Sequence, residues 1–133
     1  TARVLRDVAA ALAHAHAQRV VHRDVKPENV FLAAADGRAL LGDFGIARSI
    51  DAEALLTQHG ASLGTPAYMA PEQVAGRRLD ARTDVYALGL VGWEMLAGER
   101  PWRGATLYDL LHRQQFEPLP DLADRRPDAP VYL

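Results

Sequence analysis

The sequence predicts an α+β fold that is mainly helical and carries one small β-hairpin. Apolar residues recur at helical spacing over residues 1–18 and again in a strongly apolar run at 85–96. Two short β-prone segments flank the turn residues Asp36 and Gly37. Hydrophobic residues make up 49% of the 133 residues, so the chain can form a packed core, at least as part of something larger.

The first predicted element is a helix over residues 1–18. Val4, Val8 and Leu12 fall on one face of this helix. The surrounding positions are rich in alanine, which has the highest helix propensity of all residues. The helix leads into a polar loop around Asp24.

A hairpin follows this loop. Residues 30–33 are predicted to pair with residues 39–41, because an Asp-Gly pair between two short β-prone runs is typical of a tight turn. The hairpin then has one polar loop before it and another after it.

The second half of the chain is predicted to be a long loop followed by two helices. Residues 44–67 show no sustained period and contain several glycines, which is typical of a functional loop. Asp84 is predicted to cap a helix over residues 85–96 that ends at Gly98. A second helix is predicted over residues 106–115.

Composition and charge exclude several classes of protein. A formal net charge of −2 gives no basic surface that would bind nucleic acid or a membrane, so neither contact is expected from this segment. The chain has no cysteine and so no disulfide or thiolate site, and we expect a cytoplasmic location, with any membrane anchor outside this segment. His14 and His16 do not share a helix face and are not predicted to bind metal.

Three short motifs carry the candidate chemistry. Residues 22–29 read His-Arg-Asp-Val-Lys-Pro-Glu-Asn, residues 43–45 read Asp-Phe-Gly, and residues 70–72 read Ala-Pro-Glu. The first two supply, within 22 residues, a base, a cation that can face a phosphate and two metal-ligand side chains. Phosphoryl transfer from a nucleotide requires this set. Three motifs in this order and with these gaps are very improbable by chance.

These motifs resemble the catalytic half of a protein kinase. Residues 68–73 and 84–89 look most like bacterial serine/threonine kinases of eukaryotic type. The resemblance runs from the first helix to about Trp102. It implies the large, C-terminal lobe of the kinase fold, in which the hairpin carries the catalytic and metal-binding loops, and it implies ATP and protein substrates.

The resemblance assigns the chemistry to five side chains. Asp24 is expected to accept the proton of the substrate hydroxyl, and Lys26 to contact the γ-phosphate of ATP. Asn29 and Asp43 are expected to hold Mg²⁺, or Mn²⁺ in its place, through oxygen atoms. Phe31 is expected to form the floor under the adenine ring.

Five further positions have expected structural roles. His22 is expected to stack with Phe44 in a buried spine, next to Gly45. Asp84 is expected to bond to the backbone of the catalytic loop as well as to cap its helix. Glu72 usually pairs with an arginine that this chain does not reach, so a buried Glu72 would be left unpaired.

Substrate class and regulation also follow from the resemblance. Lys26 favours serine/threonine over tyrosine specificity, and Thr65 is expected to hydrogen-bond to the catalytic aspartate and lysine. Arg23, directly before the catalytic aspartate, is expected to pair with a phosphate on the long loop. Thr57 is the favoured phosphosite and Ser62 the second.

The chain also departs from the kinase pattern. It contains no Gly-rich loop, strand lysine or helix glutamate, so residues 1–133 are expected to be a partial kinase domain without the N-terminal lobe and the last helices. We expect negligible kinase activity from this segment alone, and an active parent protein that could pair with a second kinase copy for activation-loop phosphorylation. Arg19 stands where kinases commonly have glycine, which implies mild strain if its φ is positive.

Two other functions remain open from the sequence. One is a non-catalytic docking lobe, such as a pseudokinase or scaffold, that keeps the peptide-docking surface of residues 65–72. The intact set of Asp24, Lys26, Asn29 and Asp43 argues against it. The other is a small-molecule phosphotransferase of kinase-like fold, a class that generally lacks the segment at residues 64–72.

Overall fold

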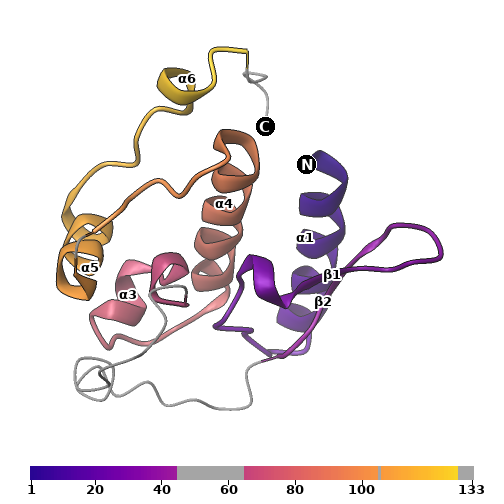
Figure 1. Ribbon diagram of the computed structural model, residues 1–133. Coiled ribbons are helices and arrows are strands. Elements are labelled where there is room, and N and C mark those ends of the chain that lie inside the picture. The colour runs from indigo at the N-terminus through magenta and orange to yellow at the C-terminus, as the bar shows by residue number, and fades with distance from the viewer. Residues whose placement is uncertain (45–64, 105, 129–133) are drawn as a thin grey trace.

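The computed structural model describes residues 1–44, 65–104 and 106–128, which form a set of helices with one two-stranded antiparallel sheet at its side (Figure 1). The elements in chain order are α1 (Ala2–Ala17), the 3-10 helix η1 (Pro27–Asn29), β1 (Val30–Leu32), β2 (Ala39–Leu41), the 3-10 helix η2 (Thr65–Tyr68), α3 (Pro71–Val74), α4 (Ala81–Ala97), α5 (Leu107–Phe116) and α6 (Leu122–Arg125). The mainly helical α+β prediction is therefore confirmed.

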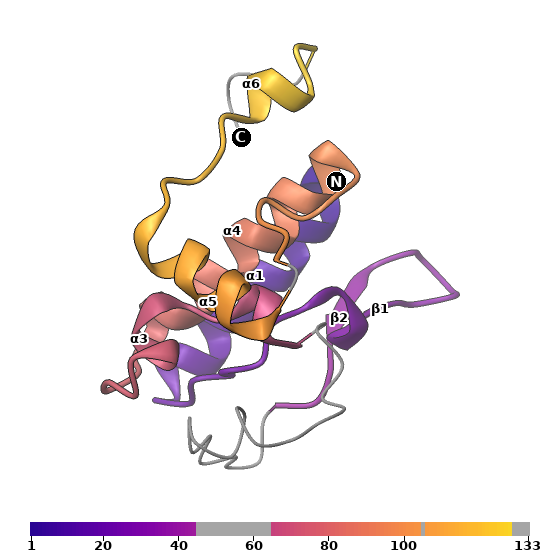
Figure 2. The same ribbon diagram turned by 60° about the vertical axis from the view of Figure 1, so that its left-hand side comes forward.

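Helices α1 and α4 lie side by side and form the centre of the molecule (Figures 1 and 2). Val8 and Leu12 of α1 belong to the same buried core cluster as Leu90 and Val91 of α4. The two helices approach closely at Gly92, where a Cβ atom would lie 3.1 Å from Cδ1 of Leu5. The predicted helix over residues 1–18 is confirmed as α1.

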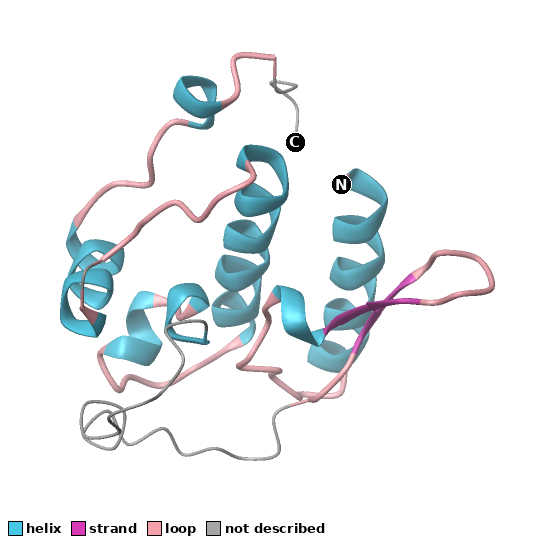
Figure 3. Ribbon diagram, in the orientation of Figure 1, coloured by secondary structure: helices cyan, strands magenta, loops and turns pink. Residues whose placement is uncertain are grey.

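The hairpin forms with the predicted partners (Figure 3). Val30 pairs with Leu41 and Leu32 with Ala39, and Gly37 in the turn has a φ of 66°, which glycine adopts without strain. Asp7 of α1 holds the hairpin, because its Oδ2 accepts a hydrogen bond from the Ala39 amide at 3.2 Å. That bond lowers the pKa of the Asp7 carboxyl.

Helix α4 begins earlier than predicted. Asp80 is its N-cap and accepts a hydrogen bond from the amide of Arg82 at 2.8 Å, whereas Asp84 lies inside the first turns of the helix. The prediction that Asp84 caps the helix was therefore wrong, because polar Arg82 and Thr83 precede the apolar run and hide the true start. The predicted end at Gly98 is confirmed, with a φ of 76°.

The remaining elements are short and only partly predicted. Helix α5 confirms the helix predicted over residues 106–115, with Thr106 as its N-cap. The loop predicted over residues 44–67 mostly lies outside the described residues, but its end forms η2 instead. Helices α3 and α6 have four residues each, too few to show a period in the sequence. Within the described ranges, no helix combines the length and apolar character needed to cross a membrane.

Arg19 has a left-handed backbone conformation directly after α1, with a φ of 59°. Replacing Arg19 by glycine is expected to raise the free energy of unfolding by about 0.5–1 kcal/mol. The left-handed conformation costs about 1–2 kcal/mol for a residue with a Cβ atom, and glycine avoids this cost. The greater flexibility of glycine in the unfolded chain offsets part of the gain.

Urea unfolding of the two proteins measures this difference. Gln18→Gly is the matched control, since Gln18 has a φ of −87° and gains nothing from glycine. A loss of stability in Arg19→Gly equal to that in Gln18→Gly would contradict the strain assigned to Arg19.

Candidate active site

The polar loop and the hairpin bring the predicted site residues together from two directions. Asp24 and Lys26 lie in the loop between α1 and η1, and Asn29 ends η1 directly before β1. Asp43 follows β2. The amide of Gly42 donates to the carbonyl of Asn29 at 2.9 Å, so the hairpin pairing continues up to the residue before Asp43.

The carboxylate of Asp24 is the centre of this group. Nζ of Lys26 lies 2.8 Å from Oδ2 of Asp24, and Nδ2 of Asn29 donates to the same oxygen at 3.1 Å. Asn29 also donates to the backbone carbonyl of Asp24 at 2.8 Å. The Asp24 side chain is 36% exposed, so an incoming molecule can reach it. Among the described residues, no hydrogen bond reaches its Oδ1.

Asp84 anchors the loop from below. Its side chain is completely buried, and its two oxygens accept hydrogen bonds from the amides of His22 at 2.8 Å and Arg23 at 2.7 Å. This is the contact to the loop backbone that the resemblance to kinases implied. A third donor comes from α1, where Nε2 of His16 lies 2.7 Å from Oδ2 of Asp84. Because a carboxylate only accepts, Nε2 of His16 carries the hydrogen.

His22 connects the two loops of the site. It is completely buried, and its ring centroid lies 4.7 Å from that of Phe44, with the ring planes tilted by 56°. The expected contact between the two rings is present, but Phe44 is 38% exposed, so the expectation of a buried spine does not hold for Phe44. Nε2 of His22 donates to the carbonyl of Gly42 at 2.9 Å, while Nδ1 accepts from the amide of Asp24 at 3.3 Å. These two bonds fit one neutral tautomer, with the hydrogen on Nε2.

The segment after the undescribed loop is tied to α4. The hydroxyl of Thr83 donates to Oε1 of Glu72 at 2.7 Å, so the expectation of an unpaired Glu72 does not hold for this half-buried carboxylate. The hydroxyl of Tyr68 donates to Oε2 of Glu94. Burial has the largest effect on the pKa of Tyr68 and the hydrogen bond to Glu94 the next largest, and together they raise this pKa far above its usual value. Tyr68 is therefore a neutral donor at physiological pH.

Some predicted site residues lie apart from this group or outside the described ranges. Phe31 is 51% exposed on β1 and packs over Gly42, where a Cβ atom would lie 2.6 Å from its ring. Gly45, Thr57 and Ser62 lie outside the described residues, and so does the side chain of Thr65.

Asn29 and Asp43 are suited to a hard cation. Asn29 is buried, and because its Nδ2 points at Asp24, its Oδ1 points the other way. Asp43 is exposed directly after the hairpin. Two oxygen donors suit Mg²⁺, which keeps waters and takes further oxygens from substrate phosphates. In the described part of the chain, no group of three or more His, Asp or Glu side chains could hold a metal ion by itself. The ion would therefore also need oxygen ligands from water and from the substrate phosphates.

Sequence reasoning missed two residues of the site. His16 was predicted not to bind metal and was assigned no other role, and no role was predicted for Gln73. Gln73 donates through Nε2 to the carbonyl of Arg23 at 2.9 Å and accepts through Oε1 from the amide of Ala70 at 3.0 Å. Neither contact leaves a local pattern in the sequence, because the partners of His16 and Gln73 in the site lie 68 and 50 residues away.

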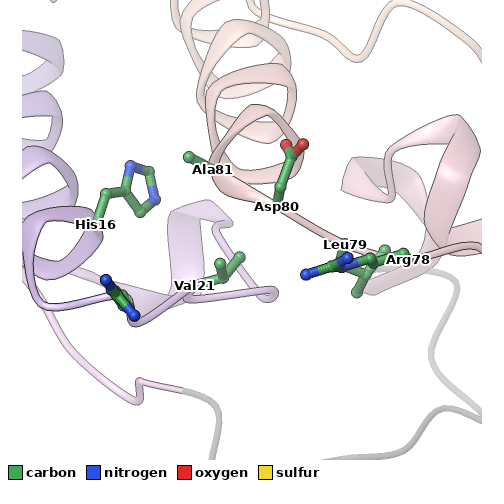
Figure 4. Close-up of a pocket in the computed structure, with 7 residues that line it drawn as sticks. His16, Val21, Arg78, Leu79, Asp80 and Ala81 are labelled. Carbon is green, nitrogen blue, oxygen red and sulfur yellow. The ribbon is translucent and has the colours of Figure 1, made fainter.

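A cavity of about 570 Å³ lies between the end of α1 and the start of α4 (Figure 4). Its lining consists of His16, Arg19, Val21, Arg78, Leu79, Asp80 and Ala81. None of the side chains around Asp24 lines this cavity. Among the described residues, the candidate chemistry is therefore separate from this cavity.

Comparisons with known proteins agree with these motifs. A sequence model described as the protein kinase domain matches residues 1–127. The serine/threonine-protein kinase Pkn1 of Myxococcus xanthus is 45% identical over 120 residues, which are 88% of this chain and 17% of Pkn1. The DNA damage-responsive serine/threonine-protein kinase RqkA of Deinococcus radiodurans is 42% identical over 120 residues, 90% of this chain and 18% of RqkA.

A third relative is matched over more of its length. The serine/threonine-protein kinase PknA of Mycobacterium tuberculosis is 42% identical over 127 residues, which are 96% of this chain and 28% of PknA. The chain therefore spans between 17% and 28% of the length of these three relatives.

Replacing Asp84 by asparagine is expected to lower the free energy of unfolding by about 3 kcal/mol, because one amide oxygen cannot accept from all three donors. In either orientation, the buried NH2 group of the asparagine would face one backbone N–H, that of His22 or that of Arg23. Urea unfolding measures the loss.

Asp80→Asn is the matched control for this substitution. It is expected to change stability by less than about 0.5 kcal/mol, because asparagine and aspartate are equivalent helix N-caps. Equal small effects of the two substitutions would contradict the anchoring role of Asp84.

Proposed function

Since the chain belongs to the protein kinase family, we propose that its parent protein is a serine/threonine protein kinase that transfers the γ-phosphate of ATP to hydroxyl groups of proteins. The observation that carries this proposal is the convergence of Lys26 and Asn29 on one carboxylate oxygen of Asp24. This segment then supplies the acceptor side and the metal side of the active site. In this assignment it corresponds to most of the C-terminal lobe.

Asp24 is proposed as the residue that orients the acceptor hydroxyl and accepts its proton. Lys26 and Asn29 hold Oδ2, so Oδ1 is available to the hydroxyl of a bound substrate. A carboxylate held in this way keeps its direction during the reaction, which favours in-line attack on the γ-phosphate.

Lys26 is proposed to contact the transferred phosphoryl group. Its ammonium offsets negative charge that develops as the phosphoryl group moves to the acceptor. Because Nζ of Lys26 also contacts Asp24, the cation and the base keep a fixed spacing. That spacing would bring the acceptor hydroxyl close to the phosphate that it attacks.

Protein kinases use ATP with a divalent metal ion, and we propose Mg²⁺ here. Asn29 and Asp43 would hold it, and the ion would neutralise charge on the ATP phosphates. Asn29 also hydrogen-bonds to Asp24, so the same side chain orients the base. Phe31 is proposed to contact the adenine ring.

The proposal also covers the choice of acceptor residue and the regulation of the kinase by phosphorylation. Thr65 would contact Asp24 and Lys26 and favour serine and threonine as acceptors. A phosphate on Thr57, or on Ser62, would pair with the exposed guanidinium of Arg23, and a second kinase copy would add it. We propose that these reactions take place in the cytoplasm.

Replacing Asp24 by asparagine in the full-length protein is expected to lower kcat by a factor of about 100 or more, because the hydroxyl loses its proton acceptor. Phosphate incorporation from labelled ATP into a protein substrate measures kcat. Asp124→Asn, an exposed change on α6, is the matched control and should leave kcat unchanged. Wild-type kcat in Asp24→Asn would contradict the proposed mechanism.

The 133-residue segment alone is expected to have negligible kinase activity, because it contains no Gly-rich loop or strand lysine to hold ATP. The same labelled-ATP assay tests this with purified segment and full-length protein side by side. Strong magnesium-dependent phosphorylation by the segment would overturn this expectation.

A further inference from the structure

The residue before Asp24 has a strained backbone. Arg23 has a φ of 68°, in the left-handed region that side chains with a Cβ atom disfavour. Such a conformation persists only where the surrounding contacts determine it. The planar peptide between Arg23 and Asp24 begins at the carbonyl of Arg23, so the orientation of this carbonyl affects the direction in which Asp24 leaves the backbone.

Two side chains form hydrogen bonds with the backbone of Arg23, one with its amide and one with its carbonyl. Oδ1 of Asp84 accepts from its amide at 2.7 Å, and Nε2 of Gln73 donates to its carbonyl at 2.9 Å. Asp84 fixes the peptide that enters Arg23. Gln73 fixes the peptide that leaves it toward Asp24.

Gln73 also holds the segment that precedes it. Its Oε1 accepts from the amide of Ala70 at 3.0 Å, at the start of α3. One side-chain amide therefore joins the Ala-Pro-Glu segment to the catalytic loop, 50 residues away in the sequence.

We propose that Gln73 is a positioning residue for phosphoryl transfer, which sets the direction of Asp24 by holding the carbonyl of Arg23. The proposal rests on the function proposed above. Gln73 is half-buried and the side chain of Arg23 is exposed, so water can replace the lost hydrogen bond. The loss of Gln73 should therefore change the geometry of Asp24 more than the stability of the fold.

Gln73→Glu in the full-length protein tests this proposal, because glutamate has the same shape as glutamine. Ionised glutamate can still accept from the amide of Ala70, but it cannot donate to the carbonyl of Arg23. At pH 8 we expect kcat to fall about tenfold, while KM for ATP and for a peptide substrate stays within about twofold.

The pH dependence of kcat distinguishes a positioning role of Gln73 from a general disturbance of the fold by the substitution. A protonated glutamic acid donates through its O–H, as the amide of glutamine does through N–H. Because a glutamate side chain ordinarily has a pKa of about 4.3, the ratio of variant to wild-type kcat should rise as the pH falls from 8 to about 4.5. The midpoint of thermal unfolding at pH 8 should stay close to the wild-type value.

Gln115→Glu, a half-buried change on α5, is the matched control and should leave the kcat ratio near 1 at every pH. A wild-type kcat in Gln73→Glu, or a loss of kcat by the same factor at all pH values, would overturn the role of Gln73. A wild-type protein without kinase activity would instead overturn the proposed function, so the two failures are distinguishable.

Discussion

The structure depends on one buried carboxylate, that of Asp84. A fully buried charge is costly unless hydrogen bonds satisfy it, and Asp84 accepts from His16 of α1 and from the amides of His22 and Arg23. The carboxylate thus joins α4, α1 and the catalytic loop at a single point. Because Asp24 follows Arg23 directly, the position of the candidate base is set by a group deep in the helical core.

The other contacts of the site extend outward from this point. His22 reaches the carbonyl of Gly42 through its ring, and Asn29 pairs with Gly42 through the backbone, so the loops that carry Asp24 and Asp43 are held at a fixed spacing. In the described part of the chain, the non-glycine residues with positive φ are Arg19, Arg23 and Asp43. Arg23 and Asp43 belong to the two loops of the site, where backbone strain is held by nearby contacts.

Much of the fold follows from local patterns in the sequence. Apolar spacing predicts α1, and the turn at Asp36 and Gly37 predicts the hairpin, whereas its register comes from the structure. Asp84 was misplaced as a cap because Asp80, four residues earlier, has the same capping chemistry. Its bond to the loop backbone was expected only from the resemblance to kinases. His16 and Gln73 could not be predicted, since their roles depend on contacts between distant segments.

Amide hydrogen exchange at His22 and Arg23 tests the central role of Asp84 most directly. These amides belong to a loop, yet both donate to a buried carboxylate in the core. The account predicts that they exchange as slowly as core amides of α4, such as that of Leu90, and only when the fold opens as a whole. Exchange at the rate of an unprotected loop would contradict the claim that Asp84 holds the catalytic loop in place.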